Sequence, residues 1–563
     1  MSTRQPHEPG GQLAMANDTL GDDPKAVVRA TAVLDEEHVG DIQGAFGTIR
    51  MQDVAARRTW RARLLTFAAI LGPGLIVMVG DNDAGGVATY SQAGQNYGTS
   101  LLWVLPLLIP VLIVNQEMVV RLGAVTGVGH GRLIKERFGR FWASFSVGDL
   151  FVLDFLTIVT EFIGVALALG YFGVSKFVSV PIAGFALVAM TATGSFRRWE
   201  RFMLVFVAGN FLVIPLVIFS HPKAGPIVHG LFVPGIAGGA NSTSVLLIIA
   251  IVGTTVAPWQ LFFQQSNIVD KRITPRWINY ERADTVTGSF VTVIGAVLIV
   301  VTCAFAFLGT HYYGRFTNAG GVASGLEATL GHAAGTLYAL VLLNASIIGA
   351  AAVTLGTSYA VGDFFGAHHS LHRNFFQAKA FYASFAGLVA LAAAIVLIPG
   401  APLGVITVAV QALAGVLLPS ASVFLLLLCN DREVLGPWVN RPWLNGLATV
   451  IIGVLLVMSL ILVGTTVFPN INVDALSLVM GGLLVAALAV SGVFYVVRLR
   501  AHPAPATTSM SRAHRDSWRM PPLALLGRPE WSRGRTLTMW LLRIYLVIAV
   551  VLLLVKAVQL GGG

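Results

Sequence analysis

The sequence predicts an all-α polytopic membrane protein built from two inverted repeats of five helices, with helices 1 and 6 discontinuous and extra helices towards the C-terminus. Of the 563 residues, 55% are hydrophobic and 11% are charged, less than half of the ~25% charged residues typical of soluble domains. The apolar residues form long continuous runs, and two runs five helices apart carry helix-breaking residues. This composition excludes a soluble enzyme, a disordered protein, a nucleic-acid binder and a membrane β-barrel.

Thirteen apolar runs reach, or nearly reach, the ~20 residues that a helix needs to cross the hydrocarbon core. They lie at 64–96, 99–120, 143–172, 176–194, 202–220, 243–266, 284–309, 335–362, 377–399, 403–429, 443–465, 474–497 and 538–558. We therefore expect a core of ten helices in residues 61–435, two additional transmembrane helices in 436–498 and a C-terminal transmembrane helix in 538–563. Arg543 and Lys556 lie inside the last run, which weakens its assignment as a span.

The segments outside these runs set the expected orientation. Residues 1–60 are polar and show no lasting helical period, which indicates a disordered tail. Residues 499–537 form a basic linker. Lysine and arginine gather in alternate loops, whereas the opposite loops hold only Lys176, Lys223 and Arg315. The positive-inside rule then places the N-terminal tail and the linker in the cytoplasm.

The first run is interrupted near its middle. Residues 80–86 read Gly-Asp-Asn-Asp-Ala-Gly-Gly. A charged aspartate at the centre of a membrane helix costs at least about 2.5–3.5 kcal/mol, so it must face a cavity, a partner or an ion. The glycines at 85 and 86 weaken the helix and expose backbone carbonyls.

The sixth run is interrupted by Pro258, which lacks an N–H group and breaks the hydrogen-bond ladder near residues 254–257. The freed carbonyls need protein, water or an ion as a partner. Two breaks five helices apart are typical of inverted repeats with a binding site at the midplane. Carbonyl oxygens from half-helix ends, together with one carboxylate, predict a cation site.

Several segments resemble the NRAMP family (natural resistance-associated macrophage protein metal transporters). Residues 72–74 (Gly-Pro-Gly) and, eight residues later, 83–86 (Asp-Ala-Gly-Gly) resemble its first-helix signature, which has Asp-Pro-Gly-Asn at that distance. Further similarity lies at 87–94, at 121–127, at 257–259 (Ala-Pro-Trp for the family's Met-Pro-His) and at Gln411, eight residues before Pro419. The resemblance covers roughly residues 64–435. It implies a LeuT-like 5+5 inverted-repeat transporter, not an enzyme, in the plasma membrane of a bacterium.

The departures from the family pattern change the expected ligands. Asp83 keeps the family's carboxylate, but Gly86 replaces an asparagine ligand and Ala257 replaces a methionine thioether. Thioethers favour transition metals, whereas oxygen-only sites suit Mg²⁺, which keeps several waters. The expected metal-site residues are therefore Asp83, the carbonyls near Gly80 and Thr254, and the space left at Gly86 and Ala257.

Two other departures concern protons. Trp259 replaces the family's histidine, and Ile158 stands where its proton-pathway aspartate would be, although Glu161 matches the family's glutamate. The pattern resembles the NRAMP-related magnesium transporters. That resemblance implies Mg²⁺ uptake, Mn²⁺ as a second substrate, and no obligatory proton coupling. The expected partners are the transported ion and the lipid bilayer; the sequence indicates no cofactor and no particular protein partner.

The remaining polar residues are open to more than one interpretation. Asp81 and Asp83 do not share a helix face, so we interpret Asp81 as a vestibule or structural residue unless the backbone is unwound. Glu161 could face the site through water or pair within the bundle. Gln411 could act as an outer-shell or gating group or bridge two helices. Trp259 could be a plug or a core aromatic. The histidines at 368, 369 and 372 are interpreted as a flexible surface loop, because no Cys or carboxylate completes a metal shell.

Two alternative functions stay open on the sequence. The first is a proton-coupled Mn²⁺ or Fe²⁺ symporter of the same family. The second is a sodium-coupled organic-solute symporter with the same fold, in which Asp83 would repel an anionic substrate. The sequence contains no Walker motif and no nucleophile elbow, so transport would be driven by the ion gradient and the membrane potential.

Overall fold

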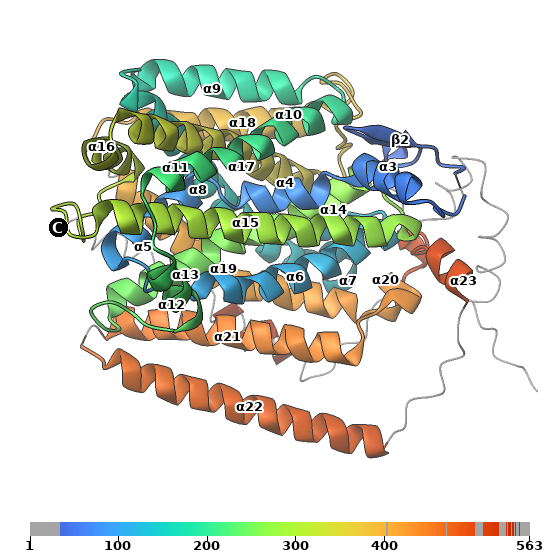
Figure 1. Cartoon of the computed structure of the whole chain (residues 1–563). Coiled ribbons are helices and arrows are strands. Elements are labelled where there is room, and N and C mark those ends of the chain that lie inside the picture. Colours follow the sequence, from blue (N-terminus) through green and yellow to red (C-terminus); the bar gives the residue numbers. More distant parts are fainter. Residues whose placement is uncertain are drawn as a thin grey trace, which may run out of the picture.

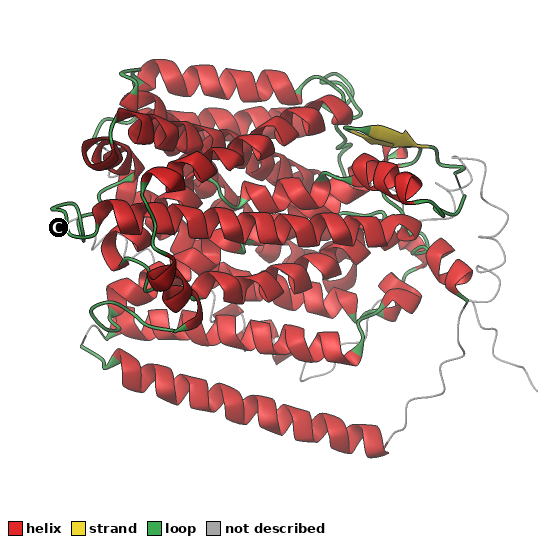
Figure 2. Ribbon diagram, viewed as in Figure 1, coloured by secondary structure: helices red, strands yellow, loops and turns green. Residues whose placement is uncertain are grey.

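The computed structural model describes residues 34–53, 55–400, 403–468, 470–501 and 511–527, together with 536, 537, 539–541, 543, 544, 547 and 551. These residues form a bundle of long, roughly parallel helices (Figures 1 and 2). One small antiparallel sheet, β1 (Ile42–Gly44) with β2 (Gly47–Ile49), lies at one end of the bundle. The predicted all-α fold class is confirmed.

The helices follow the predicted order. Those before the second break are α3 (Trp60–Ile70), α4 (Pro73–Gly80), α5 (Ala84–Tyr97), α6 (Val104–Thr126), α7 (His130–Phe138), α8 (Arg140–Tyr171), α9 (Lys176–Thr191), α10 (Phe196–Gly209), α11 (Val213–Phe219), α12 (Ala224–Phe232) and α13 (Ser242–Thr255). Those after it are α14 (Pro258–Asp270), α15 (Ile278–Phe307), α16 (Ala319–Leu330), α17 (His332–Phe365), α18 (Lys379–Leu397), α19 (Leu403–Cys429), α20 (Arg432–Leu435), α21 (Pro442–Val467), α22 (Val473–Ala501) and α23 (Arg512–Ser517).

Within the described residues, ten helices are long and apolar enough to cross a membrane, or eleven if the bent pair α3–α4 is one span. The apolar helix α9 is shorter. The first twelve predicted runs therefore correspond to helices. Most of the thirteenth run, 538–558, lies outside the described residues.

The first predicted run divides at two places instead of one. The helices α3 and α4 meet at 52°, and Trp60 and Leu65 of α3 are exposed while the helix packs against β1 and β2. We therefore assign the first span to α4 and α5 and treat α3 as a separate helix at the end of the bundle. The turn between α3 and α4 is fixed by Asp284 of α15, whose carboxylate accepts hydrogen bonds from the N–H groups of Gly72, Gly74 and Leu75 at 2.9, 2.8 and 3.2 Å.

The prediction of a disordered tail over residues 1–60 is wrong for the part that the structure describes. Residues 34–53 include η1 (Glu36–His38) and the β1–β2 hairpin, and residues 55–60 lead into α3. The hairpin is ordered because the bundle holds it: Glu200 of α10 accepts a hydrogen bond from the Ala45 N–H group at 2.5 Å, and Arg201 donates to the Ala45 carbonyl at 2.9 Å. Residues 1–33 lie outside the described residues.

The basic linker also contacts the bundle. In residues 511–527 the structure places α23 and η5 (Leu523–Leu525). The Met520 N–H group donates to the Val125 carbonyl at 3.2 Å, and Arg137 donates to the Gly527 carbonyl at 2.5 Å. The additional helices α21 and α22 lie along one side of the bundle in Figure 1.

Candidate metal-binding site

The first break of the bundle lies between α4 and α5. The helix α4 ends at Gly80, residues 81–83 are not helical, and α5 begins at Ala84. Asp83 caps α5: its Oδ1 atom accepts a hydrogen bond from the Gly86 N–H group at 2.6 Å. The break therefore places one carboxylate at the positive end of a half-helix, and it leaves the carbonyl end of α4 facing the same gap.

The second break lies between α13 and α14. Val256 and Ala257 have non-helical backbone angles, and α14 begins at Pro258. In a continuous helix the carbonyl of Thr254 would accept a hydrogen bond from the residue four positions later, but that residue is Pro258 and has no N–H group. The Thr254 carbonyl is therefore without its helical partner, as the sequence predicted.

The two breaks lie beside each other. A Cβ atom added to Gly86 would lie 3.0 Å from the Thr254 Oγ1 atom and 2.7 Å from the Asp81 carbonyl oxygen. One turn further along, the hydroxyl groups of Tyr90 and Thr255 are 2.8 Å apart and share a hydrogen bond. The structure thus brings Thr254 to Asp83 and Gly86, although Thr254 is more than 160 residues away from both in the chain.

Glu161 of α8 lies on the other side of Asp83. Its Oε2 atom accepts a hydrogen bond from the Ala84 N–H group at 3.1 Å. Gly349 of α17 lies against both carboxyl side chains: an added Cβ there would lie 2.5 Å from Glu161 Oε2 and 2.8 Å from Asp83 Cβ. Only a residue without a side chain leaves room for both carboxyl groups at this point.

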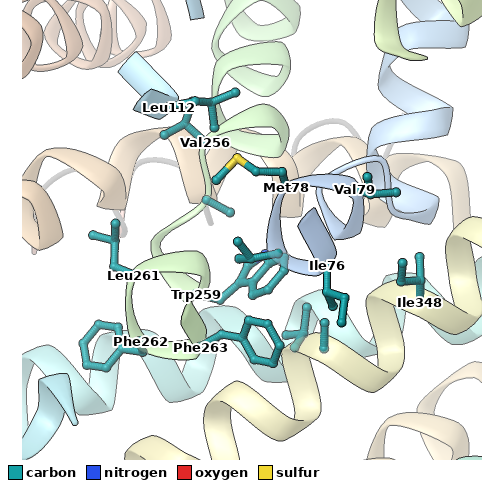
Figure 3. Packing of buried hydrophobic residues seen from close by; sticks show 14 of the residues in the cluster. Ile76, Met78, Val79, Leu112, Val256, Trp259, Leu261, Phe262, Phe263 and Ile348 are labelled. Carbon is teal, nitrogen blue, oxygen red and sulfur yellow. The ribbon is translucent and has the colours of Figure 1, made fainter. Parts of the chain in front are cut away.

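The side chains of Gln411 and Trp259 close the site on two further sides. The Gln411 Nε2 atom would lie only 1.7 Å from a Cβ on Gly85, so this amide of α19 rests directly on the first turn of α5. The Trp259 ring packs against Gly80, with its Cη2 atom 3.2 Å from the position of an added Cβ. Trp259 is 1% exposed and has Phe263 beside it at 5.8 Å between ring centroids (Figure 3).

Polar atoms without a hydrogen-bond partner gather at the breaks. Among the described residues they include both carboxylate oxygens of Asp81, Asn82 Oδ1, Glu161 Oε1, Thr254 Oγ1 and Gln411 Nε2. Buried polar atoms of folded proteins normally have partners. A group of unpartnered oxygens at one point of the bundle is therefore what a site for a hydrated cation requires.

Some residues of this region escaped the sequence analysis. Gln116 of α6 donates to Gln260 of α14 at 2.8 Å, and Gln260 donates to the Thr255 carbonyl at 3.1 Å. Asn82 donates to the Thr292 carbonyl at 3.1 Å. The signal was present, since each is an amide inside an otherwise apolar run, and polar side chains in membrane helices mark bundle interiors.

The described residues contain no group of three or more His, Cys, Asp and Glu side chains placed to hold a metal ion together. An ion at the breaks would therefore be held by few carboxylates and completed by carbonyls and water. That donor set fits the expected residues, namely Asp83 with the carbonyls near Gly80 and Thr254.

Two small hollows approach the breaks from opposite halves of the bundle. One is lined by Ala84 and Thr160, together with Asn318 and Thr407, and reaches the residues next to Asp83 and Glu161. The other is lined by Ser146, Asp149 and Leu153 of α8 and reaches Pro258, the first residue of α14. The helix α8 lines both hollows, the first with residues 160–167 and the second with residues 146–153. The hollows therefore lie towards the two ends of α8.

The fold and the paired breaks define a membrane transporter with an inverted repeat. The sequence profile of the natural resistance-associated macrophage protein-like (Nramp) family matches residues 74–465. The chain belongs to this family, whose members are transporters and not enzymes, and the predicted family is confirmed.

Known proteins similar to the chain agree with this assignment. A Staphylococcus aureus protein named divalent metal cation transporter MntH is 26% identical over 432 residues, which are 71% of this chain and 92% of that protein. The manganese transporter of Eremococcus coleocola, as a histidine-to-alanine mutant, has a TM-score of 0.58 at 19% identity and covers 80% of this chain and 97% of its own. The same transporter in complex with an aromatic bis-isothiourea substituted compound has a TM-score of 0.56 at 21% identity, over 80% and 98% of the two chains. These structures confirm the predicted LeuT-like fold.

Proposed function

We propose that the chain imports Mg²⁺, with Mn²⁺ as a second substrate, by alternating access and without obligatory proton coupling. Its family and its relatives make it a divalent metal cation transporter. What we propose beyond this function is the choice of Mg²⁺ as the main ion and the absence of proton coupling.

The absence of a thioether at position 257 carries the proposal. Ala257 lies at the second break, immediately before Pro258, where the family pattern has methionine. The thioether of Met78 comes from α4 instead of position 257, and its sulfur lies 3.5 Å from the Ser289 hydroxyl oxygen of α15. The groups at the breaks are thus oxygens of Asp83, Thr254 and the backbone. Hard oxygen ligands with room for water favour Mg²⁺, which dehydrates reluctantly.

Buried apolar side chains support transport without protons. Ile158, where the family has its proton-pathway aspartate, is fully buried on α8, and Trp259, in the place of the family's histidine, is buried against Gly80. Neither side chain can carry a proton. The membrane potential is sufficient as a driving force, since a divalent cation gains about 4.6 kcal/mol on entering at −100 mV.

The two hollows support alternating access. One reaches the breaks beside Asp83 and the other beside Pro258, from opposite ends of α8. Rocking of the broken helices against the rest of the bundle would then open the Asp83 site to one side at a time.

A proton-coupled Mn²⁺ or Fe²⁺ symporter is the second candidate, and one observation favours it. Glu161 is buried next to Asp83, so a proton could be shared between the two carboxyl groups when the ion leaves. The sodium-coupled organic-solute symporter has no such support, because Asp81, Asp83 and Glu161 would repel an anionic substrate.

Uptake into proteoliposomes across a panel of divalent ions, with a pH dye inside the vesicles, tests the proposal. We expect Mg²⁺ and Mn²⁺ uptake without acidification, loss of uptake in Asp83→Ala, and normal uptake in Asp474→Ala, a matched control at an exposed aspartate of α22. We expect Ala257→Met to shift the preference towards Mn²⁺ or Cd²⁺. Acidification during uptake would favour the symporter, and normal transport by Asp83→Ala would refute the site.

A further inference from the structure

We propose that Asp81 is a second acidic group of the cation site, which binds the ion through its water shell and favours an ion that keeps its waters. The inference rests on the proposed function and adds a residue that determines specificity. It also revises the interpretation of Asp81 as a vestibule or structural residue.

The first argument is the conformation of the backbone. Asp81 is the residue that follows α4, and residues 81–83 are not helical. The expectation that Asp81 and Asp83 cannot act together held only for a continuous helix. The unwound backbone removes that restriction, so both carboxylates can serve one ion.

The second argument is the state of the Asp81 carboxylate. The residue is fully buried, and neither carboxylate oxygen forms a hydrogen bond of ordinary geometry among the described residues. The Gln260 amide lies near the carboxylate but donates to the Thr255 carbonyl at 3.1 Å. No ion pair of the described residues includes Asp81. An isolated buried carboxylate is strongly unfavourable in a protein, so it needs a cation or a proton that the residues around it do not supply.

Asp284 shows what a structural carboxylate looks like in the same bundle. It is equally buried, but three backbone N–H groups at the start of α4 donate to it. Asp81 lies at the opposite end of the same half-helix and has none of these bonds. The difference separates a carboxylate whose bonds stabilise the fold from one that the described residues leave without such bonds. Glu281 in the first turn of α15 is also unpartnered, so the position of Asp81 at the break is needed to complete the argument.

The third argument is the position of Asp81 relative to the breaks. Its carbonyl oxygen lies 2.7 Å from where a Cβ of Gly86 would be, on the same side as Thr254 Oγ1 at 3.0 Å. A side chain at position 86 would fill this space, and glycine leaves it open for water.

The charges of Asp81 and Asp83 together match the charge of one dication, and Glu161, the third carboxyl group nearby, accepts the hydrogen bond of the Ala84 N–H group. Two carboxylates close together in a low-dielectric interior repel each other, and one dication between or beside them neutralises both. Mg²⁺ retains several waters, and these waters can donate hydrogen bonds to the unpartnered oxygens of Asp81 and to Thr254 Oγ1. Asp83 would hold the ion directly, and Asp81 would hold its hydration shell.

Asp81→Asn, measured in the purified full-length protein and in proteoliposomes, tests the inference. The amide keeps the shape and removes the charge. We expect the KM for Mg²⁺ to rise roughly tenfold or more, as for loss of a hydrogen bond to a charged group, with a smaller rise for Mn²⁺. The metal-free variant should melt no lower than the wild type, and added Mg²⁺ should raise its melting temperature less. Asp81→Glu keeps the charge and should retain more Mg²⁺ uptake than Asp81→Asn.

Three results would overturn the inference: unchanged Mg²⁺ uptake and unchanged Mg²⁺-dependent melting in Asp81→Asn, a metal-free variant that is unstable or does not fold, or equal impairment of the Asn and Glu variants. An unstable variant would show that the carboxylate is structural. Asp83→Ala distinguishes this failure from failure of the proposed function. If Asp83→Ala abolishes uptake while Asp81→Asn does not impair it, the proposed transport function is supported and the proposed role of Asp81 is refuted.

Discussion

Two buried polar regions of the bundle differ in how their charges are satisfied. The first is the site at the breaks, around Asp81, Asp83 and Thr254. The second, which we call the basal network, consists of Asp270, Lys271, Glu200, His369 and Asp363, at the end of the bundle where β1 and β2 lie. Both regions are almost fully buried. At the breaks the unpartnered carboxylate oxygens of Asp81 belong to no ion pair of the described residues, whereas in the basal network Lys271 pairs with Glu200 and His369 pairs with Asp363, although the Asp363 oxygens form no hydrogen bond there.

Asp270 illustrates the second arrangement. Its carboxylate accepts hydrogen bonds from the Ser370 hydroxyl at 2.5 Å, the Tyr359 hydroxyl at 2.6 Å and the Leu371 N–H group at 2.8 Å. The next residue, Lys271, donates to Glu200 at 2.6 Å and to the Ile70 carbonyl at 2.6 Å. The comparison teaches that burial alone does not mark a transport site. An unpartnered carboxylate marks one only where broken helices lie beside it, because Glu281 in the first turn of α15 is also buried without a hydrogen-bond partner.

We expect the largest effect on stability from breaking an ion pair of the basal network. Lys271→Met leaves Glu200 buried without its cation, which should lower the free energy of unfolding by about 3–5 kcal/mol. Thermal unfolding of the detergent-solubilised protein measures it. The double variant Lys271→Met/Glu200→Gln, which removes both charges, should recover part of the loss. A loss below about 1 kcal/mol, as for an exposed pair, would contradict the assignment of the basal network as structural.

The second prediction concerns pH and His369. Burial lowers the pKa of His369, but the neighbouring Asp363 carboxylate, with its oxygen 2.9 Å from Nε2, outweighs burial and raises the pKa from 6.5 to about 9. Because the pKa is raised in the folded state, the stabilisation is fully present below pH 6.5 and is lost as the pH rises to about 9. The loss should be on the order of 3 kcal/mol.

Unfolding measured between pH 6 and pH 10 checks this expectation, and His369→Gln should show a smaller loss over the same interval. If the wild type and the variant lose stability in parallel, the His369–Asp363 pair does not contribute to the pH dependence.

We expect the smallest effect on stability from a change at the breaks, where a substitution should alter Mg²⁺ uptake but hardly alter the free energy of unfolding. Thr254→Val removes an unpartnered hydroxyl, so the free energy of unfolding should change by no more than about 0.5 kcal/mol. Mg²⁺ uptake should fall several-fold, because water at the site loses a hydrogen-bond partner. Thr449→Val, at an exposed position of α21, is the matched control. A stability loss without a change in uptake would place Thr254 with the basal network instead.

Local chemistry made the breaks predictable from sequence. Pro258 cannot donate a hydrogen bond, and glycines and aspartates at 80–86 cannot sustain an apolar helix, so both interruptions follow from single residues. The fold then followed from the spacing of the breaks. The close contact of Gly349 with both Glu161 and Asp83 could not be predicted from the sequence, because it depends on how α8 and α17 approach each other.

The histidine loop was the clearest error. The sequence predicted a flexible surface loop for His368, His369 and His372, because no Cys or carboxylate was recognised as completing a metal shell. In the structure His368 is exposed, but His369 is 3% exposed and paired with Asp363, and His372 Nε2 lies 3.1 Å from the Asp270 carbonyl. Asp363 lies only six residues before His369 and was overlooked, whereas Asp270 on α14 is brought to the loop by the tertiary fold. The order of residues 34–53 was missed for the same reason, because their partners lie on α10 and beyond.

The carboxylate of Asp284 has a mechanical consequence for the half-helix α4. Three N–H groups bind one end of α4 to α15, and the other end stops at the unwound residues beside the cation site. The end near Gly80 is bonded to the same helix through Thr292, which donates to the Met78 carbonyl and accepts from Asn82. Both ends of α4 are therefore tied to α15, so the half-helix would shift together with α15 when the site opens.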